Sequence, residues 1–169
     1  MIKTLRRTTC ALALVAGAFG LQLNGADAAT TGSITLQGVI SQSCNITVTP
    51  QTGYNALDLT QSPANLNVAI VNEQCNDPKG YTVSMTTANG TTTGLLKGAV
   101  AGNPDTVAYT VTYNGAAVTL AGSSAQVTNV SAKTASGGVN KNLNIAYTGN
   151  ANLGADTYTD TLTFTITAK

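Results

Sequence analysis

The amino-acid sequence predicts an all-β protein, and three observations support this fold class. After the first thirty residues no segment has helical periodicity, whereas apolar and polar residues alternate in many short segments, as in strands with one buried face. Threonine, which is β-branched and polar, fills many of the polar positions in these segments. Turn residues separate the segments at the short spacing that is typical of a β-sandwich or barrel.

The N-terminal 28 residues have the pattern of a secretory signal peptide. Basic residues at positions 3–7 precede an apolar run at 11–23, and small residues follow it. We expect cleavage after Ala28, with cleavage after Ala29 as a close alternative, and export by the Sec pathway rather than the twin-arginine pathway. The apolar run is shorter than the roughly 20 residues that span a bilayer, and no second such run follows. The mature chain is therefore expected to be exported without a membrane anchor.

The mature chain is expected to be one weakly charged domain. The leader contains three of the eight Lys and Arg residues and one of the seven Asp and Glu residues, so five basic and six acidic residues remain. The remaining 141 of the 169 residues suit a single domain with its own core. A net charge near −1 without basic clusters argues against nucleic acid as a partner, because phosphates require clustered Lys and Arg.

Cleavage would also reduce the three cysteines to two, Cys44 and Cys75. An exported protein with an even number of cysteines normally oxidises them, so we expect a disulfide between these residues. Two free buried thiols are the alternative. The bridge would close a loop of about 32 residues and would stabilise the fold by roughly 3–4 kcal/mol in the chain-entropy description.

The predicted strands follow one another along the chain, each marked by apolar residues of one parity. These stripes are Ile34/Leu36/Ile40, Ile46/Val48, Leu66/Val68/Ile70, Tyr81/Val83/Met85, Val107/Tyr109/Val111/Tyr113, Leu143/Ile145/Tyr147 and Tyr158/Leu162/Phe164/Ile166. The sharpest turn signal is Asn114-Gly115, because both residues tolerate the positive φ of a type I′ turn. It predicts a hairpin in which Val111 and Tyr113 pair with Val118 and Leu120.

The sequence offers little chemistry for catalysis. It has no histidine and no tryptophan, and the two mature cysteines are expected to be paired, so the usual general base, the commonest metal ligand and a thiolate nucleophile are missing. We expect no enzyme activity and no cofactor or metal. Nearly all the carboxylates are expected in or beside turns, where Asp accepts hydrogen bonds from backbone amides. A hydrolase with two acidic residues and a calcium ion shared by Asp156 and Asp160 remain as alternatives. The carboxylates are Asp58, Glu73, Asp77, Asp105, Asp156 and Asp160.

Both ends of the mature chain carry a family resemblance. Residues 32–44, Gly-Ser-Ile-Thr-Leu-Gln-Gly-Val-Ile-Ser-Gln-Ser-Cys, place an alternating strand at the start of the mature chain and directly before the first cysteine. Together with Cys75 and the closing segment 154–166, this layout resembles the subunits of chaperone–usher pili, within the type 1-pilin-like and spore coat U-like superfamily. The middle of the chain has only a general β pattern.

The resemblance implies an immunoglobulin-like sandwich that lacks its final strand, which the N-terminal extension of the next subunit supplies by β-strand addition. It implies a signal peptide at 1–28, an N-terminal extension that acts as donor strand at 29–43, and a sandwich domain at 44–169. The inserting residues would be Ile34, Leu36, Gly38 and Ile40, which share one parity and so point to one face.

The same resemblance implies the partners and the location of the protein. The partners would be other subunits of the same kind, a periplasmic chaperone and an outer-membrane usher, with a host or surface receptor as a further partner. The product would be a fimbrium on the cell surface that supports adhesion and biofilm formation.

Two alternatives to this assembly stay open. In one, the first strand folds back into its own sandwich and completes a monomer. In the other, the protein is a secreted monomeric module that binds carbohydrate or another surface. Sugar binding usually uses exposed aromatic side chains, and Tyr54 and Tyr158 lie outside the cleanest stripes. Four further tyrosines are expected in the core or an interface, namely Tyr81, Tyr109, Tyr113 and Tyr147.

Overall fold

The computed structural model describes residues 30–169, which form ten β-strands and no helix. The all-β prediction is therefore confirmed. The signal peptide expected at residues 1–28 lies outside the described residues, as does Ala29. Within the described chain no helix is long and apolar enough to cross a membrane. The strands are β1 (Cys44–Pro50), β2 (Leu66–Cys75), β3 (Tyr81–Thr87), β4 (Gly94–Gly98), β5 (Thr106–Tyr113), β6 (Ala116–Val118), β7 (Ser124–Val130), β8 (Val139–Tyr147), β9 (Tyr158–Thr159) and β10 (Leu162–Ala168).

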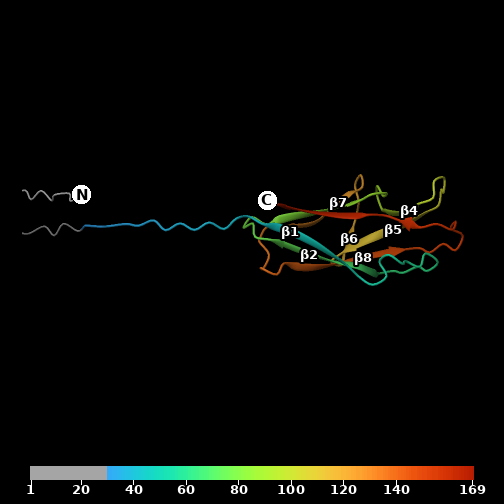
Figure 1. Cartoon of the computed structure of the whole chain (residues 1–169), viewed down its shortest axis with the longest axis horizontal. Helices are drawn as coiled ribbons and strands as arrows, with labels where there is room; N and C mark the ends of the chain where they lie inside the picture. The colour runs from blue at the N-terminus through green and yellow to red at the C-terminus, as the bar shows by residue number, and fades with distance from the viewer. Residues whose placement is uncertain (1–29) are drawn as a thin grey trace, which may run out of the picture. The chain divides into compact units, whose positions relative to one another are not determined.

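The strands form two antiparallel sheets that face each other (Figure 1). The larger sheet has the order β1-β2-β8-β5-β4-β9, with β6 paired to β5, and the smaller sheet has the order β10-β3-β7. Tyr113 of β5 stacks on Phe164 of β10 with ring centroids 5.7 Å apart, so side chains of the two sheets meet in one core. The arrangement fits the β-sandwich class that the sequence predicts.

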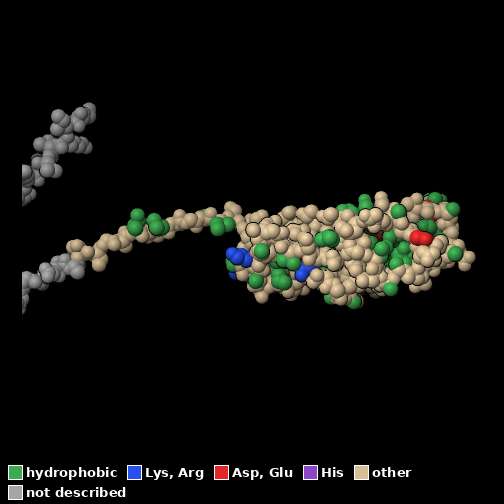
Figure 2. Space-filling model, turned by 90° about the horizontal axis from the view of Figure 1, so that it is seen from below, with side chains coloured by type: hydrophobic (Ala, Val, Ile, Leu, Met, Phe, Trp, Pro, Cys, Tyr) green, Lys and Arg blue, Asp and Glu red, His purple; other side chains and the backbone are tan. Residues whose placement is uncertain are grey.

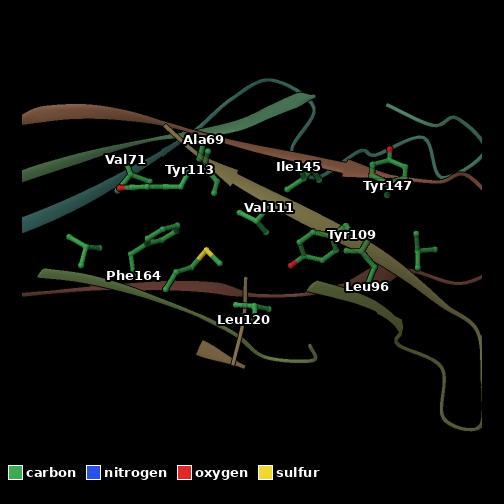
Figure 3. Packing of buried hydrophobic residues seen from close by; sticks show 14 of the residues in the cluster. Ala69, Val71, Leu96, Tyr109, Val111, Tyr113, Leu120, Ile145, Tyr147 and Phe164 are labelled. Carbon is green, nitrogen blue, oxygen red and sulfur yellow. The ribbon is translucent and has the colours of Figure 1, made fainter. Parts of the chain in front are cut away.

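The core lies between the sheets, and most of the predicted stripes contribute to it. On β2 the parity predicted from Leu66, Val68 and Ile70 is wrong: the register with β8 shifts between Asn67 and Ala69, so Ala69 and Val71 are buried and Ile70 is not. Val71 of β2 and Val83 and Met85 of β3 have no exposed surface. Figure 3 shows Val71, Val111 and Phe164 pointing into the space between the two layers. The four tyrosines that the sequence places on strand stripes are buried, as predicted; they are Tyr81, Tyr109, Tyr113 and Tyr147.

The hairpin predicted at Asn114-Gly115 is present. Both residues have positive φ, 48° for Asn114 and 85° for Gly115, as a type I′ turn requires. The turn joins β5 to β6 and places Val111 opposite Val118. Leu120 lies beyond the end of β6 but is still buried in the core.

Four segments differ from the predicted strands. The closing stripe is divided, because Tyr158 lies on β9, which pairs with β4 in the larger sheet, whereas Leu162, Phe164 and Ile166 lie on β10 in the smaller sheet. β4 and β7 have no clear stripe in the sequence, and β7 pairs with β3 through a shift in register next to Val83, which interrupts the alternation. Residues 30–43 contain no strand although their apolar residues alternate. Residues 39–169 form one compact unit, and residues 30–38 belong to a separate one.

Candidate functional site

Strands β1 and β10 are edge strands of different sheets, and they lie side by side (Figure 1). β1 pairs with β2 alone, and β10 pairs with β3 alone. Each therefore has one edge whose backbone N–H and C=O groups are paired with no strand of residues 30–169. Such an edge is a template on which another strand can form.

Several side chains that face the interior from these two strands are incompletely covered, although Phe164 of β10 is buried. Directly opposed residues of an antiparallel pair share a face, so Val48, which stands opposite the fully buried Val71, points inward. Its side chain is nevertheless 43% exposed. On β10, Ile166 stands opposite the fully buried Val83, and both Ile166 and Leu162 are only partly buried. The core is thus open along β1 and β10.

An apolar cavity of about 280 Å³ opens between the two edge strands. Val48 and Pro50 of β1 and Leu162 of β10 line it, together with the buried core residues Ala69 and Leu143. We call this cavity, with the free edges of β1 and β10, the groove. Its lining consists largely of core side chains, so it suits an apolar occupant better than a charged one.

A larger hollow of about 540 Å³ adjoins the groove, since Tyr54, Leu57 and Leu96 line both. Tyr158 lines this second hollow as well. The structure therefore brings together the two tyrosines that the sequence singles out as candidates for sugar stacking. Tyr54 is 51% exposed, whereas the Tyr158 hydroxyl donates a hydrogen bond to the Gly154 carbonyl at 2.8 Å.

The predicted inserting residues are all exposed in this structure. The exposed fractions are 84% for Ile34, 86% for Leu36 and 91% for Ile40. Gly38 has no atom within 4 Å of the place where a Cβ would stand. Several large apolar residues exposed together in one short segment normally mark a site of interaction. The described chain thus contains both an uncovered apolar segment and an apolar groove.

The predicted disulfide between Cys44 and Cys75 is present. The two residues are the first pair in the register of β1 and β2, so the bond fastens the start of β1 to the end of β2. The extension therefore joins the domain at a point that is covalently fixed.

The carboxylates in turns hold backbone and hydroxyl groups. Oδ1 of Asp160 accepts hydrogen bonds from the amides of Ala88 and Asn89, both at 3.1 Å, and Oδ2 accepts one from the Tyr109 hydroxyl at 2.8 Å. Burial, and then the hydrogen bond to Asp160, raise the pKa of Tyr109 above its ordinary value of 10. Asp160 thus connects the segment after β3 to β5 through its hydrogen bonds.

Asp156 has a similar structural role. It accepts a hydrogen bond from Asn103 Nδ2 at 2.7 Å and one from the Val100 amide at 3.0 Å. The bond from Asn103 is the main cause that lowers the pKa of Asp156 below 3.8. The acidic pair considered for calcium is thus occupied by protein donors, and residues 30–169 hold no cluster of three or more His, Cys, Asp or Glu residues that could bind a metal.

Glu73 is the exception to the expectation that carboxylates lie in or beside turns. It lies inside β2 with no exposed surface. Its carboxylate accepts hydrogen bonds from the hydroxyls of Tyr113 at 2.6 Å, Thr128 at 2.7 Å and Tyr81 at 3.0 Å. These three residues come from β5, β7 and β3, so the carboxylate ties strands of both sheets together. Burial, and then the bond to Glu73, raise the pKa of Tyr81 to about 12.

Sequence reasoning missed part of this site. Leu57 comes from the loop between β1 and β2, and Leu96 comes from the short strand β4, so no stripe connects them to the groove. For Glu73 a signal did exist, because it shares its parity with the buried residues Val71 and Cys75. The groove itself is a product of the strand order and has no local signature.

Comparison with models of known protein families and with curated proteins found no match to this chain.

Proposed function

We propose that this protein is a structural subunit of a fimbrium, which polymerises by donor-strand exchange. The observation that carries the proposal is the coexistence of an exposed apolar extension with an open apolar groove in one chain. In this proposal the sandwich is immunoglobulin-like and lacks its final strand, and the extension of another copy, residues 29–43, supplies it.

The groove and the extension are chemically matched. A strand laid along the groove can pair its backbone with the free edges of β1 and β10, and every second side chain then points into the core. Burial of Ile34, Leu36 and Ile40 would contribute on the order of 5–8 kcal/mol before ordering costs, at about 1.5–3 kcal/mol per side chain. Gly38 would lie where the groove is shallow.

The geometry of this exchange favours a filament over a closed oligomer. The donating segment and the accepting groove are different surfaces of the same chain, so each contact is head-to-tail. Each added subunit then leaves one unfilled site, and a homopolymer grows.

The proposal also accounts for export and for helper proteins. A subunit with unpaired strand edges and an uncovered groove is prone to aggregate before it assembles. A periplasmic chaperone would cover the groove, and an outer-membrane usher would bring subunits together at the cell surface. The resulting fimbrium would support adhesion and biofilm formation, without catalysis by the subunit.

The test uses the alternation of the extension. In the refolded mature chain, Leu36→Asp combined with Ile34→Asp places charges on the inserting face and should abolish fibres and high-mass oligomers in electron microscopy and size-exclusion chromatography. Val39→Asp is the matched control, because Val39 is 82% exposed in the same segment but has the opposite parity. It should assemble like the unchanged chain. Equal assembly of the two variants would refute donation by this face.

One observation favours a second candidate function, a monomeric module that binds carbohydrate. Tyr54 and Tyr158 line the 540 Å³ hollow beside the groove, and an exposed aromatic ring can stack on a sugar. A stable monomer that binds glycans on an array, and loses this binding with Tyr54→Ala, would support the second candidate over the first.

A further inference from the structure

Two residues that follow β2 hold the segment through which the extension enters the domain. The Asn76 amide donates to the Ser43 carbonyl at 3.0 Å, and Asn76 Oδ1 accepts from the Ser43 amide at 2.7 Å. Asn76 Nδ2 donates to the Ser41 carbonyl at 2.8 Å. Gln42 Nε2 donates to Asp77 Oδ2. We call this set of contacts the latch.

The latch continues the pairing of β1 with β2 beyond its last residues. Cys44 and Cys75 form the first pair of the register, and Asn76 holds Ser43 and Ser41 in the following positions with its backbone and its side-chain amide. Asp77 has little exposed surface, and its Oδ1 also accepts from the Lys79 amide at 2.7 Å, so this side of the latch is fixed to the domain.

The position of the latch matters because the chain has a groove of its own. If the extension is to fill the groove of its own chain along the free edge of β1, it must reverse direction just before Cys44. A loop of three residues, a common hairpin length, at 41–43 would place Leu36 opposite Val48 and Ile34 opposite Pro50. Opposed residues share a face, so both side chains would enter the cavity that Val48 and Pro50 line.

The latch binds the residues that this loop needs. While residues 41–43 are held, the nearest three-residue loop that keeps the same side chains inward lies at 38–40. The returning strand is then displaced by about six residues, or roughly 20 Å at about 3.3 Å per residue. Thr30 would stand opposite Val48, and no large apolar side chain of the extension would reach the cavity.

We infer that the latch prevents the chain from filling its own groove and so reserves the extension for another copy. This inference rests on the proposed function, since it concerns the use of the same extension and groove. Asn76 acts as a positioning residue, because it sets the point from which the extension is free.

The test compares two asparagine variants of the mature chain, refolded at low protein concentration. Asn76→Ala removes the two latch bonds that the Asn76 side chain makes, to Ser43 and Ser41. Asn72→Ala is the matched control, because Asn72 on β2 also makes two side-chain hydrogen bonds, to the Gly137 carbonyl at 3.1 Å and to Asn140 Oδ1 at 2.7 Å. A net hydrogen bond is worth roughly a two- to tenfold change in an equilibrium constant. A monomer whose own extension fills its groove cannot assemble, and we call it the inert monomer. We expect its fraction to be at least severalfold larger for Asn76→Ala than for the control.

Further measurements distinguish a groove filled by the chain's own extension from a simple loss of stability. The inert monomer should form in a proportion that does not rise with concentration, and it should melt at a higher temperature than the unassembled control. Gln42→Ala weakens the latch from the extension side and leaves residues 44–169 unchanged, and it should act in the same direction. Equal fractions of inert monomer in Asn76→Ala and Asn72→Ala would overturn the latch.

Failure of the latch is distinguishable from failure of the proposed function. Adding Ile34→Asp and Leu36→Asp to the Asn76→Ala chain should remove the inert, thermostable monomer, because the apolar side chains that close the groove are gone. If the unchanged chain assembles but Asn76→Ala does not close, the latch is wrong and the fimbrial proposal stands. If the unchanged chain fails to assemble and aspartates in the extension change nothing, the proposed function fails.

Discussion

The centre of the sandwich and its β1–β10 side are built from the same kinds of strand but differ in how well their inward side chains are covered. On β3, Val83 and Met85 have no exposed surface, because β10 and β7 flank this strand and the larger sheet lies opposite. On β1, Val48 faces the same core but remains 43% exposed. Alternation of apolar residues therefore decides which face of a strand points inward, whereas the presence of neighbouring strands decides whether that face is buried.

Charged side chains are sparse on the surface of the domain. Figure 2 shows few charged side chains on the visible face of the domain, in keeping with a charged fraction of 9% over the whole chain. Recognition between subunits would therefore depend on apolar burial and backbone pairing more than on charge steering.

The largest expected effect lies in the closed centre. Met85→Ala should lower the free energy of unfolding by about 2–5 kcal/mol, because it leaves a cavity in a fully buried position. Denaturant unfolding of the unassembled subunit measures this loss. A loss below about 1 kcal/mol would show that the centre is as loosely packed as the edge.

Loss of the buried carboxylate should have a somewhat smaller effect. Glu73→Ala removes the acceptor of three hydroxyls from both sheets. Water that enters the vacated space can accept from these hydroxyls, so we expect a total loss of about 1–3 kcal/mol, the cost of one unsatisfied buried donor. Glu73→Gln keeps one acceptor oxygen and nearly the same volume, so it should retain more stability in the same unfolding measurement. Equal losses in the two variants would contradict the hydrogen-bond explanation.

Alkaline pH should weaken the closed centre gradually. The pKa of Tyr81 is raised from 10 to about 12 in the folded state, so its neutral form is favoured there. The corresponding stabilisation is fully present below pH 10 and is lost as the pH rises through about 12. Urea unfolding at a series of pH values should show this decline, and Tyr81→Phe should reduce it. A decline that is complete by pH 10 would contradict the assignment.

The smallest expected effect lies at the open edge. Val48→Ala should cost the unassembled subunit about 1 kcal/mol or less, since its side chain is already partly in water. The same change should weaken assembly, because Val48 lines the cavity that the extension would fill. An assembly assay at several protein concentrations separates the two effects. Unchanged assembly would show that Val48 does not contact the extension of another copy.

Much of the fold followed from local patterns. The stripe at Tyr81, Val83 and Met85 predicts β3, and Asn114-Gly115 predicts its hairpin, because period-two alternation and positive φ are properties of a few neighbouring residues. The disulfide followed from the expected export and the even number of cysteines.

The rest depends on tertiary structure. β7 escapes prediction because a register shift in its pairing with β3 breaks its alternation. The groove brings together β1, β10, β4 and a loop that are far apart in the chain, so only the strand order creates it. The sequence shows the stripe at Ile34, Leu36 and Ile40, but these residues form no strand in the described chain. A segment that becomes a strand only when it pairs with another chain would explain this difference.

The most direct test of the account maps where Leu36 lies after assembly. Chains that carry photo-leucine are prepared in a normal and a ¹⁵N-labelled form, mixed while unfolded, refolded and allowed to assemble before irradiation. Mass spectrometry should then find cross-linked peptides of mixed isotope composition that join Leu36 to β1 or β10, near Val48, Pro50 or Leu162. Cross-links from Leu36 to these strands only within chains of one isotope, or none to the groove, would contradict strand donation between copies.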